Sequence, residues 1–160
     1  GDTYMESAGF ITGANSKTAT IDLNGHVLYA PQLAYGNFVF RNGVIADLYA
    51  ENEGGNLKIV IEDSCVILKD KAQAGAELAV SGPLQFINHG TVNGIRRMLY
   101  QTARPNKINI TNYGTIFSAE GIAVSMRAFH QNSAITLQNN GIIAGLIRGL
   151  DVHSAGENST

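Results

Sequence analysis

The 160-residue chain has one cysteine, three prolines and no tryptophan, and only 15% of its residues are charged, against roughly 25% in an average soluble domain. With the single thiol of Cys65, the chain cannot form an internal disulfide. No apolar run approaches the roughly 18 residues of a membrane span, so we expect no direct membrane insertion. Ile, Val, Leu and Phe are nevertheless plentiful, which excludes a disordered chain.

Glycine and asparagine are abundant instead: 18 of 160 residues are Gly, about 11% against a usual ~7%, and 15 are Asn. These residues are poor helix formers, and so are the many β-branched ones, which disfavours a helical bundle. The net charge of −2 and the pI near 6.1 argue against a nucleic-acid partner bound through bulk positive charge. The four histidines lack metal-ligand spacing, and we expect neither a metal nor a cofactor.

Three segments of the chain repeat one pattern, which reads apolar, x, apolar, x, Asn, x, Gly, x, apolar. They are residues 84–92, 108–116 and 135–143. A fourth copy, residues 59–67, aligns Asp63 with the Asn and Cys65 with the Gly. Shorter and looser copies cover residues 38–45 and 21–28.

The glycine-like positions 43, 65, 90, 114 and 141 follow one another at 22, 25, 24 and 27 residues. Periods of this length indicate a solenoid, a propeller or an array. Each copy opens with the period-two alternation of a strand that buries one face, and its Asn and Gly tolerate the left-handed conformation of a sharp bend.

The repeats therefore predict an all-β fold, a right-handed parallel β-helix of about five to six rungs, each rung being one circuit of the chain. The β-helix is expected over residues 19–152, after a lead-in or cap over residues 1–18 and before a frayed tail over residues 153–160. An antiparallel sandwich with ordinary Asn-Gly turns is the alternative. Residues 69–80 are predicted as a short helix or a protruding loop. The residues expected to point inward are Ile59, Ile61, Phe86, Ile108, Ile110, Ile116, Ile135 and Leu137.

Stacking the repeats places three asparagines at one corner of the β-helix. They are Asn88, Asn112 and Asn139, and we expect their side-chain amides to hydrogen-bond along the stack. The last rung is expected to be open, since Val152 is the one large apolar residue after Leu150. We therefore expect this rung to be covered by another molecule or by further sequence, with self-association through it as one outcome.

The run from Thr20 to Leu28 resembles the opening rung of pectate-lyase-like β-helices. The later Asn-x-Gly-Thr-Ile/Val copies look like the repeats of type V secreted passengers, the autotransporters and haemagglutinin-type exoproteins, and the resemblance covers about residues 20–150. It implies a non-enzymatic, secreted rod at the bacterial cell surface that presents loops to a host or bacterial surface glycan or protein. The alternative is a phage tailspike or tail-fibre segment of the virion tail, which binds or degrades surface polysaccharide.

Five residues within twelve positions form a basic cluster with one aromatic ring: Arg96, Arg97, Tyr100, Arg104 and Lys107. Guanidinium groups suit carboxylates and sulfates, and Tyr suits the face of a sugar, so the cluster is a candidate contact patch for an acidic glycan. The alternative is a solvated loop between two rungs.

No catalytic residue is predicted. Cleavage of a glycan by a lyase or a glycosidase requires positioned carboxylates, whereas the acids of the repeats occupy unlike positions in the pattern. These acids are Asp22, Asp47, Glu62, Asp63, Glu120 and Asp151. Cys65 replaces a glycine in an apolar rung, which favours a small buried hydrophobe over a nucleophile.

Overall fold

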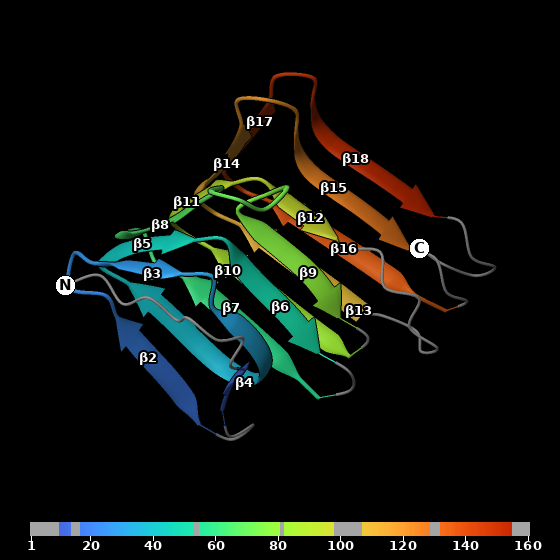
Figure 1. The fold of residues 1–160 in the computed structure, drawn as a ribbon. Helices are drawn as coiled ribbons and strands as arrows, with labels where there is room; N and C mark the ends of the chain where they lie inside the picture. The colour runs from blue at the N-terminus through green and yellow to red at the C-terminus, as the bar shows by residue number, and fades with distance from the viewer. Residues whose placement is uncertain are drawn as a thin grey trace.

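The computed structural model describes residues 10–13, 17–52, 55–80, 82–97, 107–128 and 132–154. Within these ranges the strands pair in parallel and wind into a β-solenoid of about five turns without helices (Figure 1). The predicted fold class is thereby confirmed, and the antiparallel sandwich is excluded. No helix of the described residues has the length and apolarity to cross a membrane.

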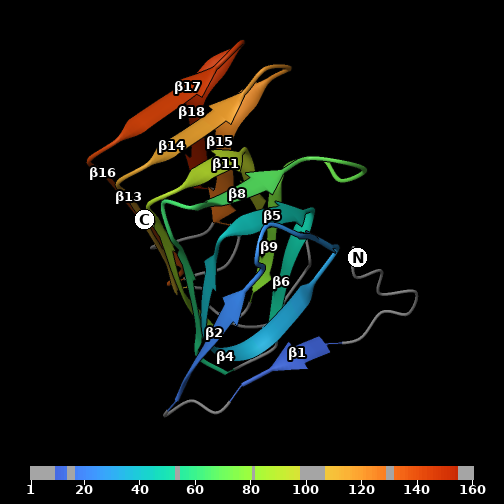
Figure 2. The same ribbon diagram turned by 90° about the vertical axis from the view of Figure 1, so that its left-hand side faces the viewer.

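The solenoid has three faces, which the chain visits in the order 1, 2, 3 (Figure 2). Face 1 contains β2 (Thr18–Asp22), the second half of β4 (Gln32–Arg41), β7 (Leu57–Ile61), β10 (Pro83–Asn88), β13 (Lys107–Asn112) and β16 (Ala134–Asn139). Face 2 contains β3 (Val27–Tyr29), β5 (Gly43–Ala46), β8 (Cys65–Leu68), β11 (Thr91–Asn93), β14 (Thr115–Ser118) and β17 (Ile142–Gly145).

Face 3 contains β1 (Phe10–Thr12), the first half of β4, β6 (Leu48–Asn52), β9 (Ala76–Val80), β12 (Ile95–Arg97), β15 (Ile122–Ala128) and β18 (Arg148–Ser154). Because β4 runs from face 3 into face 1, these two faces form one 12-stranded sheet, while face 2 is a separate six-stranded sheet. Corner 1–2 is where face 1 meets face 2, and corner 2–3 is where face 2 meets face 3.

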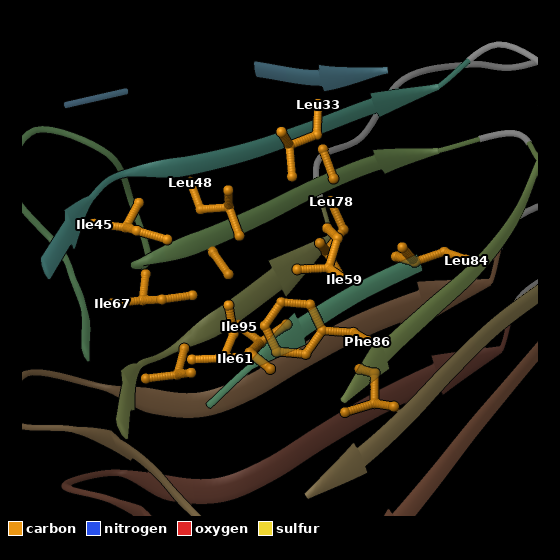
Figure 3. Packing of buried hydrophobic residues seen from close by; sticks show 14 of the residues in the cluster. Leu33, Ile45, Leu48, Ile59, Ile61, Ile67, Leu78, Leu84, Phe86 and Ile95 are labelled. Carbon is orange, nitrogen blue, oxygen red and sulfur yellow. The ribbon is translucent and has the colours of Figure 1, made fainter. Parts of the chain in front are cut away.

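One apolar core runs along the inside of the three faces, because alternate residues of each strand point inward (Figure 3). Six of the eight residues predicted to point inward are at most 1% exposed: Ile59, Ile61, Phe86, Ile108, Ile110 and Ile116. The other two, Ile135 and Leu137, belong to β16 at the end of the stack and are partly buried against the core.

The register corrects the predicted alignment of the fourth repeat. Asn88 pairs with Ile61, not with Asp63. Gly43 pairs with Cys65 as the spacing predicted, so the corner after β7 is two residues longer than the corner after β10. The sequence pattern does not reveal this shift, because two residues restore the same inward face of a strand.

The structure also corrects the reason for the repeated glycine. The left-handed residues of the described chain lie elsewhere, and they are Asn24, Gly25, Ala30, Gly36, Asn42, Asp47, Gly94 and Asn132. A Cβ on Gly90, Gly114 or Gly141 would lie 2.1 Å from a backbone carbonyl oxygen of the preceding rung. Close stacking of the corners therefore requires glycine at these positions.

Three predicted segments are refined by the structure. Residues 69–75 are a loop, but residues 76–80 form β9, so a helix over 69–80 is wrong. Within the predicted lead-in, β1 pairs in parallel with β4. At the other end β18 continues to Ser154, two residues past the predicted end of the solenoid.

Candidate functional site

A line of polar side chains crosses the outside of face 3. Its members pair with one another from strand to strand, and we call them the outer column: Tyr49, Glu77, Arg96, Ser125 and Asp151. They face outward because the residue before each of the first four is an inward residue at most 1% exposed, namely Leu48, Ala76, Ile95 and Val124. Glu77 is 5% exposed, and the other four are half-buried.

The loop of residues 69–75 connects β8 to β9 at corner 2–3 (Figure 2), and it contacts the outer column through Glu77. It is organised by Asp47, which sits at this corner with a φ of 58°. The Asp47 carboxylate accepts the backbone N–H groups of Asp70 at 2.7 Å, Lys71 at 2.7 Å and Ala72 at 3.1 Å. These bonds satisfy a side chain that is only 4% exposed, and they fix the course of the loop.

Glu77 holds the same loop from the neighbouring strand, because its carboxylate accepts the backbone N–H of Gln73 at 2.9 Å. Tyr49 pairs with Glu77 across the sheet. Burial raises the pKa of the Tyr49 phenol above its ordinary value near 10, and the charges of Asp47 and Glu77 raise it further. The phenol therefore keeps its proton at neutral pH and can donate a hydrogen bond.

An ion pair also links the loop to corner 2–3 two rungs further along the solenoid. Lys69 Nζ lies 2.6 Å from Glu120 Oε2. The hydrogen bond and charge of Lys69 lower the pKa of Glu120. Because Glu120 is exposed, the pair is screened by water, and the bonds to Asp47 and Glu77 contribute more to the order of the loop.

The described members of the predicted basic cluster lie on two adjacent faces, on either side of the connection from β12 to β13. Arg96 belongs to the outer column on face 3, whereas Lys107 is an exposed residue at the start of β13 on face 1, next to Pro83 and Ala134. The backbone of Arg97 pairs with Leu78. Tyr100 and Arg104 lie outside the described residues, so the patch remains a prediction.

The three asparagines predicted to stack lie in register at the end of face 1, where corner 1–2 begins. Asn88 Nδ2 donates to Asn112 Oδ1 at 2.8 Å, and Asn112 Nδ2 donates to Asn139 Oδ1 at 2.7 Å. We call this series the amide ladder. Each amide also donates to the carbonyl of the glycine two residues later, at 3.2, 3.1 and 3.0 Å. The ladder thus satisfies corner carbonyls as well as its own amides.

The amide ladder runs in one direction and begins unsatisfied. Asn88 Oδ1 is buried and has no hydrogen-bond partner within the described chain. Its neighbour on the preceding rung is Ile61, which offers no donor. Asn88 and Asn112 are fully buried, whereas Asn139 is exposed at the far end.

The residues between Asn and Gly form a second stack outside corner 1–2. The rings of His89 and Tyr113 lie parallel, with centroids 4.8 Å apart and an interplanar angle of 7°. This distance equals the spacing of neighbouring strands, so the rings stack along the solenoid axis. Their facing sides contact each other, which favours a structural role over the binding of a sugar face.

The remaining reactive candidates have structural surroundings. Cys65 is fully buried, and this burial raises the pKa of its thiol from 9.0 to about 11, so the thiol is not a nucleophile at neutral pH. Asp22 accepts hydrogen bonds from Asn24, Asn42 and Arg41, which lower its pKa. No group of three or more His, Cys, Asp and Glu that could hold a metal ion occurs in the described ranges.

Asp47 and Glu77 are the site residues that the sequence did not reveal as a pair. The available signal was the single Asp between the apolar segments of β5 and β6, since Asp is one of the few residues that adopts a left-handed corner. No protein-family model, curated protein or solved structure matches the chain.

Proposed function

We propose that this chain is a non-enzymatic, surface-exposed rod that binds an extracellular glycan, in the manner of a type V secreted adhesin. The observation that carries the proposal is the outer column of face 3 beside a loop fixed by Asp47 and Glu77. The regular faces form a rigid scaffold, and the loop protrudes from it beside the outer column. Binding residues of many proteins are presented on loops of this kind.

The chemistry of the outer column suits a sugar. Tyr49 offers a ring and a neutral O–H, Arg96 offers a planar fork of donors, and Ser125 lies between Arg96 and Asp151 as a small hydroxyl. Aligned polar groups at the spacing of neighbouring strands can contact successive hydroxyls of an extended glycan. The sequence resemblance to type V secreted passengers supports a location at the bacterial cell surface.

The test is a glycan array followed by titration of the glycans that bind. Ser125→Arg places a long side chain between Arg96 and Asp151 in the outer column and is expected to weaken binding at least tenfold. The matched control is Asn109→Arg, which makes the same change at an exposed position on face 1. Equal binding by both variants, or no glycan bound at all, would contradict the proposal.

The glycans that bind on the array also distinguish a non-enzymatic adhesin from the tailspike alternative. Incubation with each bound glycan should leave it intact. Release of reducing ends or unsaturated uronates would instead favour a tailspike-type enzyme that degrades polysaccharide.

A further inference from the structure

The rung formed by β16, β17 and β18 ends all three faces of the described solenoid (Figure 1). Leu150 and Val152 of β18 are each 48% exposed, although they pair with Val124 and Met126, which are at most 1% exposed. Both residues therefore occupy the inward columns of the core, with no further rung over them in the described chain.

More apolar surface gathers at this end of the molecule. Five of the eight exposed large hydrophobic residues of the described chain lie between residues 142 and 152: Ile142, Leu146, Ile147, Leu150 and Val152. The three strands of this rung also pair on one side only, so each presents a free edge of N–H and C=O groups. The open end of the core, where Leu150 and Val152 are exposed inside three free parallel edges, fits another solenoid rung.

The amide ladder indicates which hydrogen-bond acceptors that rung must carry. Asn88 and Asn112 each donate to an Asn Oδ1 and to a backbone carbonyl of the following rung, at 3.3 Å to Thr115 and 3.1 Å to Ile142. Within the described residues, Asn139 Nδ2 donates to its own Gly141 carbonyl alone. Its bonding pattern lacks the two acceptors that a following Asn-x-Gly rung supplies.

We infer that this end is a docking surface for a β-solenoid rung of the same type, stacked in parallel register with an Asn over Asn139 and a Gly over Gly141. The N-terminal end of a second copy does not meet this requirement. Ile21 pairs with Phe40, Phe40 with Ile61, and Ile61 with Asn88, so a copy stacked head to tail would place Ile21 over Asn139. The Asn139 amide would then face an apolar side chain and would lack the Oδ1 acceptor that an Asn at this place supplies.

The structure supplies the linker for a direct test. β15 ends at Ala128, β16 begins at Ala134, and Ala128 pairs with Ser154. A second copy of residues 129–154 inserted directly after Ser154 therefore repeats the connection between rungs. The matched control carries Asn139→Leu in the copy only, and a Thr136→Ser change at an exposed position marks the peptides of the copy in both chains.

Backbone amide exchange by mass spectrometry reports whether the added rung docks. With the Asn copy, exchange of the original residues 134–154 should slow at least tenfold, and with the Leu copy the protection should be at least tenfold weaker. Equal protection by both copies, or none with the Asn copy, would overturn the inference. A native chain that sediments as a dimer with residues 134–154 already protected would overturn it too, since the occupant would then be a second copy.

Discussion

The inward position at corner 1–2 is filled in two different ways along the solenoid. In the early rungs it holds apolar residues, Ile21, Phe40 and Ile61, and in the later rungs it holds the amide ladder, Asn88, Asn112 and Asn139. The corners differ in the same place. Phe40 to Gly43 is three residues and Ile61 to Cys65 is four, whereas each Asn is two residues from its Gly.

The difference shows how corner length selects the residue inside it. The wide corners satisfy their backbone from outside, since Asp22 caps the N–H of Asn24, and Ser64 Oγ accepts the N–H of Asn42. The interior is then free for a large apolar side chain. A two-residue corner brings its own carbonyl within 3.0–3.2 Å of the inward side chain, and an amide there can donate to it.

The largest effect is expected when an amide is moved into the apolar rungs. Ile59→Asn buries an amide that has no partner and leaves a cavity, so we expect a loss of about 4 kcal/mol in the free energy of unfolding. Ile61→Asn places the amide beside Asn88, whose Oδ1 lacks a donor, and should cost about 2 kcal/mol less than Ile59→Asn. Urea unfolding of both variants checks the order, and equal losses would show that the ladder cannot be extended.

Substitution of the glycine in a two-residue corner should disrupt the close stacking of the corners. The Cβ of Gly114→Ala would lie 2.1 Å from the carbonyl oxygen of Gly90, so the rungs must separate, at a cost of about 3 kcal/mol. At Gly121 the nearest atom to such a Cβ is Ser118 Oγ at 3.9 Å, and Gly121→Ala should be nearly neutral. Thermal unfolding compares the two, and a Gly114→Ala variant as stable as the native chain would contradict the close stacking of corners.

Removal of an amide should cost more inside the ladder than at its end. Asn112→Ala deletes the acceptor of Asn88 and leaves the carbonyls of Gly114 and Ile142 without this donor, for an expected loss of about 2 kcal/mol. Asn139→Ala also deletes an acceptor, that of Asn112, but the position is exposed and only the carbonyl of Gly141 loses its donor, so the expected loss is about 1 kcal/mol. A loss at Asn139 as large as that at Asn112 would mean that burial does not set the strength of the ladder.

Cys65, which occupies the glycine position of a wide corner, should give a smaller effect: a loss of folding stability at high pH. Its folded-state pKa is about 11, above the ordinary 9.0, so the folded chain favours the neutral thiol. The corresponding stability is fully present below pH 9 and is lost as the pH rises through 11, with about 1 kcal/mol lost by pH 10. Tyr49 acts in the same direction at higher pH, and Cys65→Ala should flatten the fall between pH 9 and 10.

Much of this arrangement was predictable from the sequence. The alternation of apolar and polar residues indicates which residues point inward, and the recurring glycine indicates where each corner lies. The stacking of Asn88, Asn112 and Asn139 follows from copies of equal corner length. The alignment of Asp63 failed because a two-residue insertion at a corner leaves the period-two pattern intact. The support of the loop by Asp47 was hidden for another reason, since it depends on one left-handed residue and on backbone N–H groups 23 to 25 positions away.

The most direct test of the amide ladder is the hydrogen exchange of the asparagine side-chain amides, followed by NMR on chain labelled with ¹⁵N-asparagine. Because Asn88 and Asn112 are buried and donate along the stack, their Nδ2 protons should exchange at least a hundredfold more slowly than those of exposed asparagines. Asn139, at the exposed end, should exchange nearly as fast as the exposed ones. Fast exchange at Asn88 and Asn112, or equal exchange at all three positions, would contradict a hydrogen-bonded ladder inside the solenoid.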